Sequence, residues 1–350
     1  MRLLVLLGLL MLGACGGLQL NLKQAVARKP GNVAMLFTVE QEGKPVKGVT
    51  AQTIKIFEDG VELPEAQSRK LLPPLSEAAQ RYTVVLVDLG LSRAGADVLA
   101  DIRAAVVSFA RQLLATHELS VYGFDGRPDL VQLVEPTNDP GRVELGMLSL
   151  AGSVKDPSSN LNGAMVLGVK RLREQMDRST RPVRVGHLVL LTGNIDRAGR
   201  VSEELLLKAL EQAKIQRHVV GLGRDLPVSR LEPLSQDPVI QARLPVTEPV
   251  LDRPPDGAAP TSQPASQPAP PKKETATDQL TVGQAFTRLG ARIIDFDRKL
   301  VLLSYCSPLR AGTHGVRVEV HLGELYGSVE YQFSADGFGP GCDPSSVPTL

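Results

Sequence analysis

Residues 84–92 read VVLVDLGLS, and this stretch decides the fold class. Four apolar residues stop abruptly at Asp88, which a glycine and a serine follow at positions 90 and 92. Nearly continuous apolar runs of this length are typical of strands that a sheet buries on both faces. Similar runs follow as LSVYGF (119–124), HLVLLTG (187–193) and RHVVGLG (217–223). The chain is therefore predicted to build a sheet that helices cover on both sides.

Helical patterns separate these strands. Between the first two strands, apolar residues recur at helical spacing and form one stripe: Val98, Leu99, Ile102, Val106, Phe109 and Leu113. A second helix is expected over about 162–176, and a third from near Ser202, where Glu203 and Glu204 suit the positive end of a helix dipole. The alternation predicts an α/β domain over 80–245 with a doubly wound, mostly parallel sheet.

The flanking segments have a different character. Residues 32–75 alternate in short apolar bursts with turn signals between them, which predicts a small β-rich module. Residues 246–277 are rich in proline, alanine and serine, which predicts a disordered linker. Residues 278–350 contain a helical pattern and then alternating strands, which predict a last helix and a C-terminal antiparallel extension.

The composition excludes one class of partner. The 350 residues include 39 basic and 38 acidic side chains, and 4% of the residues are aromatic. A nucleic-acid-binding surface needs a basic footprint and stacking platforms. We therefore expect no nucleic-acid partner.

The N-terminus indicates export. One arginine precedes a short apolar run that ends in LGAC at Cys15, and this run is too short to span a bilayer. It resembles the lipobox of bacterial lipoproteins, in which the cysteine receives a lipid and becomes the first mature residue. The resemblance implies a signal peptide over 1–14, a tether over 15–31 and an acylated (palmitate-type) anchor in the bacterial cell envelope. Gly16 favours the outer membrane within this family. The alternative is an ordinary signal peptide with an incidental cysteine.

If Cys15 carries a lipid, Cys306 and Cys342 remain. Cysteines left over in an exported, oxidising compartment usually pair, which predicts a disulfide. Two free thiols are the alternative, because sequence separation does not show whether the two Cβ atoms can meet.

From Asp88 onward the chain resembles a von Willebrand factor type A domain. The matching loops are DLGLS (88–92), SSNLNGA (158–164) and LVLLTGN (188–194), in the family's order across about 82–224. The hairpin-like stretch from 119 to 139 and the tail around 304–320 also resemble bacterial members. The resemblance implies the fold given above and a loop edge that binds a protein partner.

The family's metal-ion-dependent adhesion site is degenerate in this sequence. Gly90 stands where a ligand hydroxyl belongs, and Gly193 stands where the third-loop aspartate belongs. The resemblance leaves Asp88, Ser92 and Ser159 as metal residues. One carboxylate is a poor ligand set for Mg²⁺, so we expect no resident cofactor and at most weak Mg²⁺ binding.

Other carboxylates offer an alternative ligand set. Asp125, Asp156 and Asp196 lie in or near the same loops and could complete the site, or serve only in turns. We expect the partner-binding edge to comprise Asp88, Ser92, Ser159, Asn194 and Asp196.

Catalytic motifs are weak. GLSRAG (90–95) misses the nucleophile elbow by one position, and GLGRD (221–225) lacks the third glycine of a dinucleotide site. The histidines have no metal-ligand spacing and are expected at the surface or at strand edges. We therefore expect no enzyme activity and a non-catalytic protein-binding function for an unknown envelope partner. A structural envelope component and an undetected hydrolase are the alternatives.

Overall fold

The computed structural model describes residues 17–150, 154–244 and 279–350. The expected signal peptide, Cys15 and the linker over 246–277 lie outside the described residues. In the part of the chain that is described, no helix has both the length and the hydropathy that crossing a membrane requires. Contacts divide the described chain into two compact units, one formed by residues 17–82, 172–187 and 290–350, the other by 83–150, 154–171, 188–244 and 279–289.

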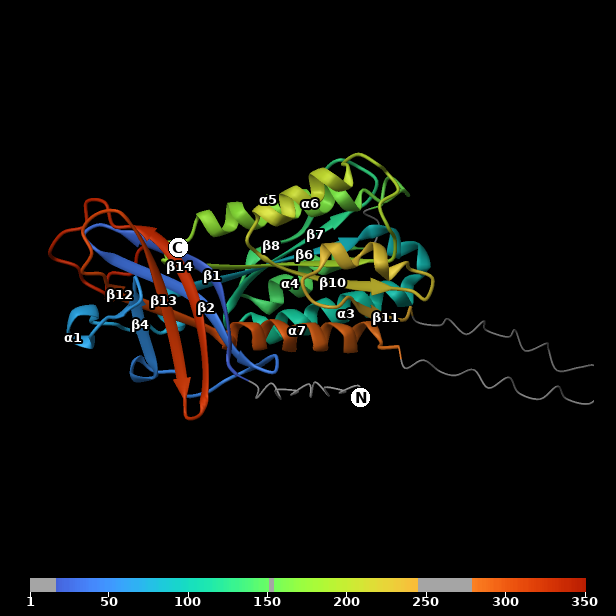
Figure 1. Cartoon of the computed structure of the whole chain (residues 1–350). Helices are drawn as coiled ribbons and strands as arrows, with labels where there is room; N and C mark the ends of the chain where they lie inside the picture. Colours follow the sequence, from blue (N-terminus) through green and yellow to red (C-terminus); the bar gives the residue numbers. More distant parts are fainter. Residues whose placement is uncertain (1–16, 151–153, 245–278) are drawn as a thin grey trace, which may run out of the picture. The chain divides into compact units, whose positions relative to one another are not determined.

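A six-stranded sheet organises the second unit, with strand order β11-β10-β9-β6-β7-β8 (Figure 1). The strands are β6 (Ala79–Asp88), β7 (His117–Phe124), β8 (Val131–Thr137), β9 (Val183–Thr192), β10 (Gln216–Leu222) and β11 (Ile240–Ala242). The chain builds outward from β6 in one direction and then returns to β9, so the strand order reverses between β6 and β9. Strands β7 and β8 pair antiparallel, as the hairpin pattern predicted. The predicted fold class, an α/β fold with a mostly parallel central sheet, is confirmed.

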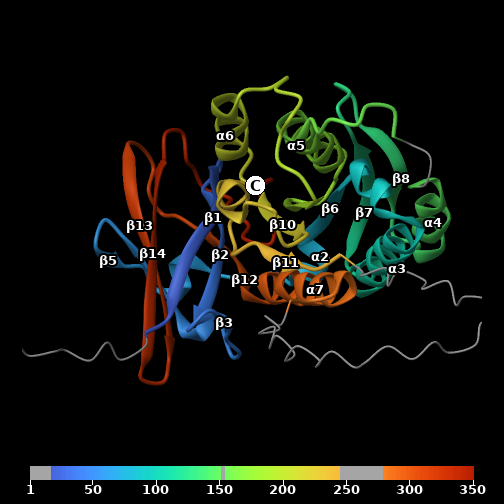
Figure 2. The ribbon, with the colours of Figure 1, turned by 90° about the vertical axis from the view of Figure 1, so that its right-hand side faces the viewer.

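Helices cover both faces of this sheet (Figure 2). On one face lie α5 (Leu161–Asp177) and α6 (Glu203–Gln212), and on the other lies α3 (Ala96–Leu113). Gly168 brings α5 close to the sheet, because a Cβ there would lie 2.8 Å from Leu86 Cδ1 and 2.9 Å from Leu188 Cδ1. Phe109 of α3 meets Phe286 of α7 (Val282–Lys299) edge-on, with 5.4 Å between ring centroids.

Shorter elements connect these helices and strands. They are η2 (Leu89–Ala94), α4 (Pro140–Gly146), η3 (Met147–Leu150), η4 (Val228–Arg230) and η5 (Glu232–Leu234). Of these, η2 follows β6 directly, so it carries Ser92 of the first predicted loop.

The first unit contains two antiparallel sheets. One has the order β1-β2-β12, with β3 paired to β2, and the other has the order β14-β13-β4-β5. The elements are β1 (Gln19–Arg28), β2 (Asn32–Gln41), β3 (Lys44–Pro45), η1 (Ala51–Thr53), β4 (Ile54–Glu58), β5 (Val61–Glu62), α1 (Glu65–Ser68), α2 (Leu75–Ala78), β12 (Leu300–Cys306), β13 (Thr313–Leu322) and β14 (Leu325–Ser334). The predicted C-terminal antiparallel strands are present.

The structure differs from the expected modules in two places. Residues 19–28, expected within a tether, form β1 and pair with β2 over almost their whole length. Strands of the expected N-terminal module pair with the C-terminal segment, β2 with β12 and β4 with β13. The physical reason is burial, because a few short strands cannot bury a core alone and their edges need hydrogen-bond partners.

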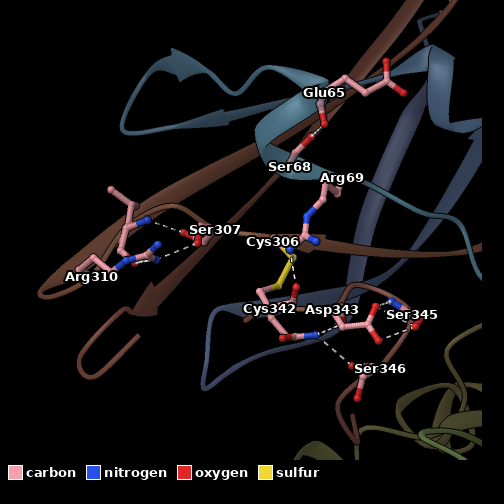
Figure 3. The surroundings of a disulfide bond; sticks show 12 residues. Glu65, Ser68, Arg69, Cys306, Ser307, Arg310, Cys342, Asp343, Ser345 and Ser346 are labelled. Atoms are coloured by element: carbon pink, nitrogen blue, oxygen red, sulfur yellow. Dashed lines mark hydrogen bonds between the residues drawn. A yellow bond between two sulfur atoms is a disulfide. The ribbon is translucent and has the colours of Figure 1, made fainter. Parts of the chain in front are cut away.

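The disulfide predicted between Cys306 and Cys342 is confirmed (Figure 3). It joins the end of β12 to the C-terminal tail, and both cysteines are buried. Arg69 donates to the Cys342 carbonyl, and its Nη2 lies 3.2 Å from Cys306 Sγ. The Asn32 amide holds the same tail by donating to the carbonyls of Asp343 and Ser346.

Candidate functional site at the strand switch point

The ends of β6 and β9 meet where the strand order reverses. Asp88 is the last residue of β6 and Thr192 is the last residue of β9. The Thr192 hydroxyl lies 3.0 Å from Asp88 Oδ2, so the two strand ends share one edge of the sheet. In open α/β sheets this edge, at the switch point, is the usual place for a ligand.

Internal hydrogen bonds occupy both oxygens of Asp88. Oδ1 accepts from the Gly90 backbone N–H at 2.9 Å, and Oδ2 accepts from the Asn194 side-chain amide at 3.1 Å. The residue is 1% exposed. Burial raises the pKa of the Asp88 carboxyl, and the hydrogen bonds from Asn194 and Gly90 oppose this rise. The Asp88 carboxylate therefore links the first and third loops through hydrogen bonds.

Backbone hydrogen bonds connect the second loop to the third loop. The Ser159 carbonyl accepts from the backbone N–H groups of Arg197 (2.8 Å) and Ala198 (3.0 Å). Asp196 accepts from the Asn162 N–H at 3.0 Å, in the first turn of α5, where a carboxylate stabilises a helix. Ser159 is 3% exposed, and its hydroxyl has no hydrogen-bond partner among the residues that the structure describes.

The first loop reaches the second through Arg93. Its guanidinium donates to the Pro157 carbonyl at 3.0 Å. Ser92, beside it in η2, is half-buried, as are Asn194 and Asp196, whereas Asp88 and Ser159 are buried. Of the residues expected at the loop edge, a partner can therefore reach Ser92, Asn194 and Asp196 in this conformation.

The residues at this edge do not fit a divalent cation. A Cβ at Gly193 would lie 2.5 Å from Leu91 Cδ2, so the Leu91 side chain fills the space that any side chain at position 193 would need. A Cβ at Gly90 would lie 2.9 Å from Asp88 Oδ1, which leaves no room for a hydroxyl-bearing side chain without a shift. The Asn194 amide donates to the carboxylate that a cation would need. Mg²⁺ prefers several oxygen ligands in octahedral geometry, and this edge does not offer them.

The carboxylates considered as substitute ligands have structural partners. Asp125 is fully buried and accepts from Arg127 Nε at 2.9 Å and from the Lys155 N–H at 3.0 Å. Burial would raise the pKa of Asp125, but these hydrogen bonds outweigh it and lower the pKa. Asp156 accepts from the Ser158 N–H and hydroxyl, which lower its pKa. Both carboxylates shape the second loop, as the turn-forming alternative described.

Sequence reasoning missed several buried residues, both polar and apolar. Thr192 and Leu91 were not singled out, although Thr192 stands in the quoted third loop and Leu91 in the first. The histidines were expected at the surface or at strand edges, and the surface position is wrong for three of them, because His117, His187 and His218 are 2%, 0% and 3% exposed. Each occupies a strand position that points into a covered face of the sheet, where His117 Nδ1 lies 3.0 Å from the Thr83 hydroxyl.

No protein-family model and no curated protein matches this sequence. Solved structures with similar folds include a von Willebrand factor type A protein from Catenulispora acidiphila, at 9% identity, covering 96% of this chain and 77% of that one, with a TM-score of 0.41. The von Willebrand factor domain of the type V pili tip protein Mfa5 from Porphyromonas gingivalis shares 12% identity over 47% of this chain and 90% of that one, with a TM-score of 0.37.

Proximal thread matrix protein 1 from the mussel byssus shares 10% identity over 47% of this chain, with a TM-score of 0.41. This chain spans 43% of the mussel protein's length.

Proposed function

We propose that this chain is a lipid-anchored protein of the bacterial cell envelope whose α/β unit binds a protein partner without catalysis. One observation carries the proposal: three loops at the strand switch point are joined into one surface. Asp88 joins the first and third loops, and Ser159 joins the second and third. A surface preorganised in this way loses little conformational entropy on binding.

We propose further that the surface works without a metal ion. A cation at such a site offers an open coordination position to a partner's carboxylate. Here Leu91 fills the space beside Gly193, and the Asn194 amide donates to the Asp88 carboxylate, so both disfavour a bound cation. Recognition therefore rests on the shape and polarity of the three loops. Binding should therefore be insensitive to chelators.

The anchoring half of the proposal rests on the sequence LGAC at residues 12–15. The Cys306–Cys342 disulfide agrees with an oxidising compartment, because such bonds are rare in reducing ones. Mass spectrometry of the mature N-terminus tests it, and we expect a chain that begins at Cys15 and carries acyl groups. A chain that begins elsewhere, or an unmodified Cys15, would refute the anchor.

Site-specific photocrosslinking in intact envelopes tests the binding half. A photoreactive residue at Ser92 or Arg197 should give a discrete adduct with another protein, in the presence and absence of EDTA. The matched control is Lys170, which is exposed on α5, outside the three loops, and should give none. Adducts of equal strength at all three positions would show that the loop edge is not the docking surface.

A structural envelope role is the second candidate, and the burial of Asp88 and Ser159 favours it. Both residues join loops inside the protein instead of facing outward. Failure of crosslinking at Ser92 and Arg197 would favour this role.

A hydrolase is the third candidate, and substrate turnover that Ser92→Ala abolishes would support it.

A further inference from the structure

Leu18, just before β1, is already fixed to the first unit. Its N–H donates to the Tyr326 carbonyl at 3.1 Å, and the residue is 6% exposed. Gly327 permits this close approach, since a Cβ there would clash with the Leu18 carbonyl oxygen. Strand β1 begins at the next residue, Gln19. From Leu18 onward, the backbone is therefore held against β14.

This position sets the reach of the proposed lipid anchor. Leu18 follows Cys15 by three positions, and an extended chain spans at most about 3.6 Å per residue, so the two residues lie within about 11 Å of each other. Acyl chains on Cys15 would insert into the hydrocarbon core and hold the cysteine at the level of the headgroups. The polar layer of one leaflet is about 5–8 Å thick. Protein surface around Leu18 therefore reaches the headgroups.

Two other segments lie at the same end of this unit, as Figure 2 shows for β3 and the turn between β13 and β14. Strand β3 is there because Glu40 pairs with both Gln19 and Pro45. The loop after β3 approaches the turn, since a Cβ at Gly48 would lie 4.0 Å from Leu322 Cδ2. Together these segments form the entry surface, which comprises Leu18, residues 42–49 and residues 322–326.

The exposed side chains of the entry surface suit a headgroup layer. Tyr326 is 57% exposed, and its ring stacks on His321 with 5.7 Å between ring centroids. Tyrosine is enriched at membrane–water interfaces, because its ring is apolar and its hydroxyl is polar. The exposed charged residues of this surface balance one another, and they are Glu42, Lys44, Lys47 and Glu324. Contact with lipid therefore depends on the anchor and on Tyr326, and not on anionic headgroups.

We propose that the entry surface lies against the lipid headgroups of the membrane that holds Cys15. The inference rests on the lipid anchor of the proposed function and adds which face of the first unit meets the bilayer. The chain from Cys15 to Leu18 is no longer than the diameter of one α-helix, about 10–12 Å with side chains. No folded partner fits between this surface and the headgroups, so the lipid itself is the occupant. The anchor thus fixes the orientation of the first unit, which a flexible tether over 15–31 would not do.

Quenching by lipid headgroups tests this contact. The lipidated full chain is purified from membranes and reconstituted into phosphatidylcholine vesicles, in which a fraction of the lipids carries a nitroxide on the headgroup. A polarity-sensitive fluorophore is attached at Glu324→Cys, in the turn between β13 and β14. Labelling is specific, because Cys306 and Cys342 form a disulfide and the Cys15 sulfur carries the lipid. This fluorophore should lose most of its emission in the nitroxide vesicles.

The matched control is a fluorophore at Thr313→Cys. Thr313 is exposed at the opposite end of the same hairpin, and a strand of this length places it about 30 Å from Leu322. Its emission should not change. A second variant inserts a Gly/Ser segment of about 20 residues between Gly16 and Gly17, which has a root-mean-square length of about 25 Å. The insertion should restore most of the emission at Glu324→Cys.

Equal quenching at the two positions, or quenching at neither, would overturn the inference. A blue shift at Glu324→Cys without quenching would also overturn it, since a second copy of the chain would then cover the entry surface. Quenching that persists in the insertion variant would overturn the role of the short anchor.

Failure of the anchor is distinguishable from failure of the contact. An unmodified Cys15 in mass spectrometry would remove the anchor and this inference together. An acylated chain that floats with the vesicles but shows no quenching at Glu324→Cys would retain the anchor and remove only the contact. Neither result depends on crosslinking at Ser92 or Arg197.

Discussion

At the scale of single residues, the contact between Leu91 and Gly193 separates this loop edge from a metal site. Leu91 is 5% exposed, and its Cδ2 atom occupies the space that any side chain at position 193 would enter. An aspartate side chain at position 193 and the present Leu91 rotamer would therefore exclude each other. An aspartate introduced at position 193 would need Leu91 to move.

We expect Gly193→Ala to lower the free energy of unfolding by about 1–3 kcal/mol, because the new methyl group overpacks against Leu91. In a Leu91→Ala background the same change should cost much less, which a double-mutant cycle by urea denaturation measures. Additive effects of the two changes would contradict this contact. Titration calorimetry on Gly193→Asp should detect no Mg²⁺ binding while Leu91 is present.

A second residue-scale prediction concerns Asp125, whose folded pKa lies below its ordinary value of 3.8. A carboxyl group whose pKa is lower in the folded chain than in the unfolded chain stabilises the fold when the pH is above the unfolded-chain pKa. This stabilisation is lost as the pH falls through the folded-chain pKa. We expect Asp125→Asn to cost about 2–3 kcal/mol at pH 7, because the Arg127 contact loses its charge. The difference from the natural chain should shrink below pH 3.8.

The control for this experiment is Asp129→Asn. Asp129 is exposed on the same loop, and its replacement should leave the free energy of unfolding nearly unchanged. Denaturation curves measured between about pH 2.5 and pH 7 check both variants. This range covers the ordinary pKa values of carboxyl groups. A difference that stays constant over this range would show that Asp125 acts through its shape and not its charge.

At the scale of elements, a strand could be predicted from the sequence when its burial leaves a local apolar pattern. A strand whose pairing depends on distant segments could not. The buried runs at 84–92 and 187–193 predicted β6 and β9, because a strand covered on both faces carries a continuous apolar signal. The helix over α3 was also predictable from its stripe. These elements place the loop edge, so its position was predictable too.

Strand β1 was not predicted, and the reason is physical. Its side chains are mostly half-buried, so the apolar alternation in QLNLKQAVAR is weak. Its partner β2 also pairs with β12, more than 250 positions further on in the sequence, as in Leu36 with Leu302. Such pairings carry no local signal. The Leu91 contact was hidden for the same reason, because no sequence pattern states which side chain fills the space above a glycine.

At the scale of the whole molecule, N-terminal and C-terminal strands of the described chain come together within the first unit. Strands β2, β4 and β13 share one hydrophobic core, which includes Phe37, Ile56 and Val318. The Cys306–Cys342 bond, the Arg69 guanidinium and the Asn32 amide then hold the C-terminal tail against this core. Folding of this unit therefore requires contacts between residues that are far apart in the sequence. Such long-range contacts slow the formation of β pairs.

We expect removal of the disulfide by Cys306→Ala with Cys342→Ala to lower the free energy of unfolding by about 4 kcal/mol. The bond closes a loop with a sequence separation of 36, and the chain-entropy model gives this value for a loop of that length. The chain has no tryptophan, and Tyr305, Tyr326 and Tyr331 lie in the first unit, so tyrosine near-ultraviolet circular dichroism reports mainly on that unit.

Arg69→Ala is the control that separates the covalent bond from its surroundings. It removes the hydrogen bond to the Cys342 carbonyl but keeps the disulfide, and it should cost about 1 kcal/mol. Urea denaturation followed by the tyrosine signal should thus rank the double cysteine variant well below Arg69→Ala, and reduction of the natural chain should reproduce the cysteine result. If reduction leaves the unfolding midpoint of the first unit unchanged, the C-terminal tail is held by its hydrogen bonds and core contacts alone, and the covalent link contributes nothing to the stability of this unit.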